Sequence, residues 1–370
     1  MTKVLLHTPD GVRDVYGQEC SDRLQIRSRI YDRIRSYGYY DIDTPTFEYF
    51  DVFADEVNAS DARDLYKFFD KEGNTLVLRP DFTPSIARCA SKVLLENGDP
   101  VRVVYQGKSF LNKSSLQGKL KESYDIGVEF LNDDSVYADA ETIALLIESL
   151  KSAGLKEFQV SIGDADYYKG ICEAAGIDGE IEEQIREQIL SKNYFAAESI
   201  MTENNVPDKF KNLIVQVSEF IGSDEALSRA KEQITNKRST AAIERLQSLY
   251  QVLCEYGVEN YVSFDLGMLS KFNYYTGVIF SAYTYGVGDA IAKGGRYDSL
   301  LGKYGKDAPA IGFVILLDDL MSALYRQNIT LPREDEVVDI FYTENDFSKA
   351  LKEADDLRKN GKKVALKRKA

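Results

Sequence analysis

Apolar residues recur at helical spacing near the start of the chain. In the segment SDRLQIRSRIYDRIRSYGYY, one stripe carries Ile26, Ile30 and Ile34 with arginines between them, and Gly38 follows. This spacing predicts an amphipathic helix that ends near the glycine, because glycine is typical of the residue just after a helix. The expected helix therefore has one apolar face to bury.

The next part of the chain is rich in short apolar runs broken by turn residues. Residues 65–83 (LYKFFDKEGNTLVLRPDFT) place a KEGN turn between two apolar strands. Residues 103–131 (VVYQGKSFLNKSSLQGKLKESYDIGVEFL) predict two longer strands joined by a polar loop. Since side chains alternate along a strand, Asp125, Gly127 and Glu129 are expected to point to one face.

Helical patterns lie between and after these strands. Residues 83–98 (TPSIARCASKVLLENG) predict a helix with Thr83 as its cap, and residues 136–154 predict a helix that stops at a glycine. From residue 165 to 257 the pattern is almost entirely helical, which indicates an insertion.

Strand character returns after the insertion. Strands with antiparallel connections and separate helices predict an α+β fold rather than a βαβ series. Within this part, residues 296–305 (RYDSLLGKYG) predict a helix. We expect a main domain over residues 1–164 and 258–328, a helical insertion over 165–257, and a small C-terminal β-α-β piece over 335–370.

Composition narrows the function classes. The 370 residues carry a formal net charge of -14, which disfavours a broad nucleic-acid surface, although the basic run KNGKKVALKRKA is a local exception. His7 is the single histidine, so a histidine dyad or a multi-histidine metal site is excluded. The four cysteines are too far apart for a zinc cluster. No signal peptide and no apolar stretch of membrane-spanning length is found, so the cytoplasm is expected.

The stretch RPDFT is the first candidate site. It places Arg79, Asp81 and Thr83 at the end of a strand, where a carboxylate and a hydroxyl can both face a pocket. The alternative is structural, because Asp81 and Thr83 are also suited to cap the N-H groups of the helix that follows.

Two further stretches are candidates. Asp125 and Glu129 flank a glycine on one strand face, an arrangement suited to an ammonium or imidazole group, or else simply a solvated face. Gly294 and Gly295, before Arg296, allow a ligand or another backbone to approach closely, or else mark a turn.

The order of these segments resembles the catalytic domain of class II histidyl-tRNA synthetases over residues 5–325. The segments that carry the resemblance are YGYYDIDTPTFE, LRPDFT, VVYQGKSF with YDIGVEFL, LSKFNYYTGVIF, IAKGGRYDSLLGKYG and AIGFVILLDDL. The resemblance implies a class II antiparallel sheet with flanking helices. It also implies a homodimer interface at Pro45 and the helix before it.

The chain departs from that family at positions that hold ATP. Where the synthetases have arginines, this chain has Leu111 after the motif 2 strand, Ser270 in the first histidine motif and Asp319 in motif 3. No arginine occurs between residues 103 and 129. Because ATP needs fixed cations, and lysine replaces the planar guanidinium poorly, these departures argue against adenylate formation.

The amino-acid end of the pocket is better kept. Thr83, Glu129 and Tyr275 match the family, while Asp81 stands for a glutamate and Asp125 for a glutamine. The resemblance implies that carboxylates hold the ammonium or imidazole of histidine and that Tyr275 packs on the ring. Two neighbours in the GGRY segment complete the candidate set, Arg296 and Tyr297. Arg296 is expected either to contact a carboxylate or to stabilise its own loop.

This combination is similar to the family of ATP phosphoribosyltransferase regulatory subunits, which are paralogues of the synthetases. The resemblance implies a non-catalytic partner of a short-form catalytic subunit in a hetero-octamer, with histidine as feedback effector, no cofactor, no metal, no tRNA and no membrane. The reduced C-terminal piece agrees, since a synthetase would carry a full anticodon-binding domain there. A divergent active synthetase and a stand-alone histidine sensor remain the alternatives.

Overall fold

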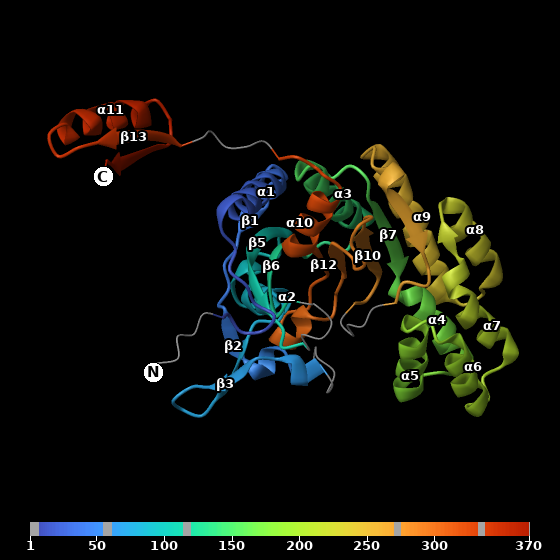
Figure 1. Ribbon diagram of the computed structural model, residues 1–370. Helices are drawn as coiled ribbons and strands as arrows, with labels where there is room; N and C mark the ends of the chain where they lie inside the picture. The colour runs from blue at the N-terminus through green and yellow to red at the C-terminus, as the bar shows by residue number, and fades with distance from the viewer. Residues whose placement is uncertain (1–6, 55–60, 114–119, 270–274, 332–336, 370) are drawn as a thin grey trace. The chain divides into compact units, whose positions relative to one another are not determined.

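The computed structural model describes residues 7–54, 61–113, 120–269, 275–331 and 337–369 (Figure 1). The chain divides into two compact units, residues 1–329 and residues 330–370. The first unit contains the sheet, its covering helices and the helical insertion. The second is a small unit of two strands and one helix.

A mixed nine-stranded sheet forms the centre of the first unit. Its strands follow the order β1-β5-β6-β12-β11-β10-β7-β9-β8, with parallel pairing at β1/β5 and at β7/β9 and antiparallel pairing elsewhere. The strands are β1 (Tyr40–Asp41), β5 (Val101–Phe110), β6 (Glu122–Leu131), β7 (Gln159–Asp164), β8 (Ile221–Gly222), β9 (Val262–Asp265), β10 (Val278–Tyr283), β11 (Ala292–Arg296) and β12 (Ala310–Leu316). The predicted hairpin is confirmed as β5 and β6, which pair over ten residues each.

Helices α1 (Gly17–Arg35), α3 (Val136–Ser152) and α10 (Leu317–Arg326) pack together and against β5, β6 and β12 (Figure 1). The isoleucine stripe of α1 is fully buried, as its spacing predicted. The side chains of Gln106 and Tyr124 contact Arg27 of α1, so this helical layer covers the sheet face that carries the even-numbered residues of the hairpin.

Helix α2 (Thr83–Cys89) covers the opposite face. Ile86 of α2 and the preceding Phe82 pack on Val103 and Tyr105, which are odd-numbered residues of β5. A separate three-stranded sheet, β2 (Phe47–Tyr49), β3 (Lys67–Phe69) and β4 (Thr75–Leu78), leads into this helix. The expectation that Thr83 caps α2 is wrong: Phe82 holds the cap position without a side-chain bond, and Thr83 is the first helical residue.

The segment predicted as a helix at residues 296–305 is also different from expectation. Only a 3-10 turn forms, at Leu301–Tyr304, and it ends at Gly305 with a left-handed φ of 94°. The backbone N-H of Tyr297 instead donates to the carbonyl of Ala310 at 2.8 Å, which extends strand pairing past β11. Strand pairing and glycine therefore outweigh the helical spacing of the leucines.

The helical insertion predicted from the sequence contains six helices. They pack mainly on one another and, through α9, on α3 and β7 (Figure 1). The helices are α4 (Ala165–Ala175), α5 (Gly179–Leu190), α6 (Tyr194–Glu203), α7 (Asp208–Gln216), α8 (Asp224–Gln233) and α9 (Lys237–Glu255). The short strand β8 interrupts them between α7 and α8 and joins the main sheet.

The second unit is the predicted β-α-β piece. Strands β13 (Val338–Tyr342) and β14 (Val364–Arg368) pair in parallel, and α11 (Phe347–Lys359) connects them. Its core is small: Ile340, Ala350 and Ala354 are buried with a few half-buried neighbours. In the described part of the whole chain, no helix combines the length and the apolar character needed to cross a membrane.

Candidate functional site

The candidate site lies on the sheet face that α2 covers. Asp125 and Glu129 project from β6 on this face, with Gly127 between them. In the register of the hairpin, Asp125 pairs with Gly107 and Glu129 pairs with Val103. Although strand alternation placed both carboxyl groups together correctly, neither is solvated: Asp125 is 5% exposed and Glu129 is 1% exposed.

Glu129 is held by two hydroxyl groups from distant parts of the chain. Thr83 at the start of α2 donates to Oε1 at 2.7 Å, and Tyr297 donates to Oε2. Burial raises the pKa of Glu129 to about 8, although both hydroxyl groups oppose this rise. The group therefore holds its proton near neutral pH unless a cation comes close to it.

Asp125 lies four residues before Glu129 on β6, on the same face of the strand. Burial raises its pKa to about 7, hydrogen bonds from Ser109 and Ser123 lower it, and the nearby charge of Asp81 raises it. Arg79 supplies the adjacent cation: a Cβ on Gly107, opposite Asp125, would lie 2.6 Å from Nη2 of Arg79. Arg79 is itself fixed by the carbonyls of Lys108 at 2.9 Å and Thr44 at 2.8 Å.

Asp81 joins the group through the turn that precedes α2. Its Oδ1 accepts from the backbone N-H of Phe82 at 2.6 Å and of Thr83 at 3.3 Å. Asp81 therefore does satisfy backbone donors, as the structural alternative predicted. Thr83 does not, because its hydroxyl donates to Glu129.

Two tyrosine side chains lie over glycines on this face of the sheet. A Cβ on Gly127 would overlap with the hydroxyl of Tyr105, so this hydroxyl lies over the glycine between the two acidic residues. Tyr275 covers the next strands: a Cβ on Gly295 would lie 2.6 Å from its Cε1. Sequence analysis identified Tyr275 but missed Tyr105. The available signal for Tyr105 was the alternation of large and small residues in two segments that pair: Tyr105 lies opposite Gly127, and Gly107 lies opposite Asp125.

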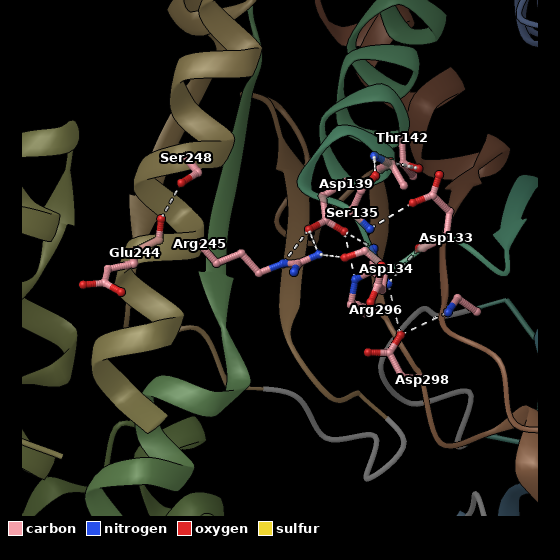
Figure 2. A network of polar contacts seen from close by, with 12 residues as sticks. Asp133, Asp134, Ser135, Asp139, Thr142, Glu244, Arg245, Ser248, Arg296 and Asp298 are labelled. Atoms are coloured by element: carbon pink, nitrogen blue, oxygen red, sulfur yellow. Dashed lines mark hydrogen bonds and ion pairs between the residues drawn. The ribbon is translucent and has the colours of Figure 1, made fainter. Parts of the chain in front are cut away.

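Arg296 is not brought into this group. Its Nε donates to Oδ1 of Asp139 at 2.9 Å, and its Nη1 donates to the carbonyl of Asp133 and to Asp298, both at 3.1 Å (Figure 2). Gly295 faces the site, so the neighbouring Arg296 faces the α3 side of the sheet. These contacts match the second of the two roles expected for Arg296, which is to stabilise its own loop. Arg296 is linked to the site through the next residue, Tyr297, whose hydroxyl donates to Glu129.

Of the three positions at which the sequence predicted a departure from the synthetases, the structure describes two. Leu111 is half-buried and packs against an apolar cluster of Phe53, Leu65 and Val77. Asp319 lies in the first turn of α10, beside Asp318. Ser270 lies outside the described residues.

The arrangement favours a ligand with positive charge. Asp81, Asp125 and Glu129 surround the same small region, and Arg79 is the cation beside them. A buried carboxyl group either stays protonated or is paired, and an ammonium or imidazolium group supplies both charge and donors. Within the described segments, no group of three or more His, Cys, Asp or Glu side chains is arranged to hold a metal ion.

Comparisons with known proteins first define the class. The sequence profile of the family described as histidyl-tRNA synthetase matches residues 11–320. The fold is that of a histidyl-tRNA synthetase from Nostoc sp. PCC 7120, with a TM-score of 0.82 over 100% of this chain and 87% of that one at 20% identity. The expected class II synthetase-like α+β fold is confirmed.

Closer similarities define the family within that class. A Bacillus halodurans structure described as an ATP phosphoribosyltransferase regulatory subunit/histidyl-tRNA synthetase is 32% identical, with a TM-score of 0.89 over 99% of this chain and 93% of that one. The ATP phosphoribosyltransferase regulatory subunit of Acetivibrio thermocellus is 39% identical over 368 residues, which cover 99% of this chain and 88% of the relative. That of Ruminiclostridium cellulolyticum is 37% identical over 364 residues, covering 98% and 87%. The chain belongs to the family of ATP phosphoribosyltransferase regulatory subunits.

Proposed function

We propose that this chain is the non-catalytic regulatory subunit of ATP phosphoribosyltransferase in the first step of histidine biosynthesis. It activates a short-form catalytic subunit in the cytoplasm and carries the feedback signal of histidine. Family membership supports the role. The acidic group formed by the buried Asp125 and Glu129 and the half-buried Asp81 is the observation that supports histidine as the effector.

Histidine fits the chemistry of this group. Its α-ammonium and its imidazole N-H groups are donors, and the site offers carboxyl oxygens on one side and the ring of Tyr275 on another. The approach of the ammonium group favours the ionised form of Asp125 and Glu129, whose pKa values burial raises. Part of the histidine binding energy is then used to remove protons from the site.

Adenylate formation is disfavoured by the charges around the hairpin. Leu111 packs into an apolar cluster, and the start of α10 carries Asp318 and Asp319 where a triphosphate would need cations. Asp318 is already held by Arg23 at 2.5 Å and by the backbone N-H of Tyr124 at 3.1 Å. Fixed cations aimed at developing charge are the main requirement for this chemistry, so the arrangement suits a regulator better than a ligase.

Regulation also sets a requirement on assembly. Histidine can inhibit only if it binds one quaternary state more tightly than another, since equal affinity shifts no equilibrium. We propose that the chain forms a dimer through Pro45 and α1 and that dimers join catalytic subunits in a hetero-octamer.

Mixing the full chain with a short-form catalytic subunit tests the proposal. We expect a complex by light scattering, a gain in phosphoribosyltransferase activity and inhibition of the complex by histidine. Absence of both complex and activation, with histidine still bound by calorimetry, would support a stand-alone sensor instead. Turnover in a histidine-dependent ATP–pyrophosphate exchange assay would support a divergent synthetase.

A further inference from the structure

The helical insertion reaches the candidate site through two basic side chains. Lys169 of α4 donates from Nζ to the backbone carbonyl of Tyr275 at 3.0 Å. Arg245 of α9 donates from Nε to Oδ2 of Asp139 at 2.7 Å. Each contact therefore joins the insertion to a residue of the main domain, over more than 100 positions of sequence.

Asp139 is the point at which the insertion meets the main domain. It lies on α3, is fully buried, and binds two guanidinium groups, one on each carboxylate oxygen (Figure 2). Arg245 approaches from α9 and also donates to the carbonyl of Asp134 at 2.9 Å, while Arg296 approaches from the end of β11. Because both oxygens are engaged, a change at one guanidinium alters the position or charge of the group that holds the other.

The backbone connects Arg296 directly to residues of the site. The next residue is Tyr297, whose hydroxyl donates to Glu129. The carbonyl of Arg296 also accepts from the backbone N-H of Thr276 at 2.9 Å, and Thr276 follows Tyr275. Tyr297 and Tyr275, two of the three tyrosines assigned to the candidate site, thus lie in or next to segments that Arg245 and Lys169 contact from the insertion.

We propose that Arg245 and Lys169 are positioning residues for the effector site and that they couple its occupancy to the placement of α9 and α4. The proposal rests on the function proposed above, in which histidine occupies this site. A ligand that tightens the contacts of Tyr297 and Tyr275 favours the docked insertion, and the docked insertion favours the ligand by the same factor.

Arg238 provides a matched control on the same helix. It binds Asp166 through Nε at 3.0 Å and Nη2 at 2.7 Å, the same pair of donors that Arg245 uses. Both members of that pair lie inside the insertion, on α9 and α4. Arg238→Gln therefore removes a similar ion pair without touching Asp139.

The first experiment needs no ligand. Hydrogen exchange of the full chain, measured by mass spectrometry, is compared among the unaltered protein, Arg245→Gln and Arg238→Gln. We expect Arg245→Gln to speed exchange in residues 133–139 and 292–298, and Arg238→Gln to leave these segments as in the unaltered protein. Equal exchange in these segments for all three proteins, or equal acceleration by both variants, overturns the coupling.

The second experiment uses histidine with the same proteins. We expect the histidine dissociation constant to rise on the order of tenfold in Arg245→Gln, to recover partly in Arg245→Lys, and to stay unchanged in Arg238→Gln. Histidine should also slow exchange in α9 of the unaltered protein. Equal affinity of Arg245→Gln and the unaltered protein overturns the proposal. If the unaltered protein binds no histidine, the effector assignment fails, and the ligand-free exchange still decides the coupling.

Discussion

The carboxylate of Glu129 on β6 occupies the space above Gly312 on β12. The two residues pair in the sheet register, and a Cβ on Gly312 would overlap with Oε2 of Glu129 and with the carbonyl of Val128. Only a residue without a side chain leaves room for the carboxylate there. The orientation that Thr83 and Tyr297 give to Glu129 therefore depends on a glycine 183 positions later in the chain.

Gly312→Ala is expected to displace Glu129 and to destabilise the fold. Overpacking of a close-packed site costs roughly 1–3 kcal/mol, and backbone on one side of Gly312 cannot move easily. Chemical denaturation of the full chain measures this loss. Gly288→Ala is the matched control, because a Cβ at Gly288 meets nothing within 4 Å, and it should change stability by less than about 0.5 kcal/mol. Similar stabilities for the two variants would contradict the role of Gly312.

Tyr297→Phe is expected to weaken the hold on Glu129. The variant removes one of the two hydroxyl donors to a fully buried carboxyl group, which costs about 1–3 kcal/mol. Since the hydrogen bond from Tyr297 lowers the pKa of Glu129, its loss raises that pKa further. Denaturation gives the stability. Tyr304→Phe, which removes a hydroxyl bonded to the carbonyl of Val52 at 2.9 Å, is the control for loss of a tyrosine hydroxyl elsewhere. Histidine affinity should fall only in Tyr297→Phe.

Arg79→Lys is expected to be destabilising although it keeps the charge. The guanidinium of Arg79 donates to three backbone carbonyls and lies 3.9 Å from the centre of the Phe82 ring. A lysine ammonium cannot make this planar set of contacts, so we expect a loss of about 1–3 kcal/mol in denaturation experiments. Arg33→Lys changes an exposed arginine paired with Glu148 at 3.3 Å and should have little effect. Equal effects would show that geometry at Arg79 is unimportant.

Elements with a clear local period were predictable from the sequence. The stripe of Ile26, Ile30 and Ile34 and the alternation around Asp125 and Glu129 are local signals, and the structure buries the first and aligns the second. Residues 296–305 also have helical spacing, but their first residues pair with β12 and only a 3-10 turn forms after them.

The contacts of the candidate site were less predictable because they are non-local. Thr83 donates to Glu129 across 46 positions, and Tyr297 donates to the same carboxyl group across 168. No local pattern distinguishes a threonine that caps its own helix from one that reaches a distant strand. The sequence therefore identified residue types for the site, while the sheet register determined which of them meet.

Stability should depend on pH in a way that reports the buried carboxyl group of Asp125. Its pKa in the fold is raised to about 7, chiefly by burial, from about 3.9 in an unfolded chain. The folded state thus binds more protons than the unfolded state between these values. Its contribution to stability is fully present below about pH 4 and is lost as the pH rises through about 7. The groups whose charges or hydrogen bonds act on Asp125 are Asp81, Asp318, Ser109, Ser123 and Arg79.

Asp125→Asn isolates this contribution from the other titrating groups. The asparagine stays neutral, so the free energy of unfolding of the variant, minus that of the unaltered protein, should increase between about pH 4 and pH 8. At about 1.4 kcal/mol per pKa unit, the increase can reach a few kcal/mol. Urea denaturation at several pH values measures this difference in the free energy of unfolding. Asp208→Asn removes an exposed carboxylate on α7 and is the control for loss of a negative charge. A difference that stays constant with pH for Asp125→Asn would show that Asp125 is ionised throughout, and the site would then hold a standing negative charge before any effector arrives.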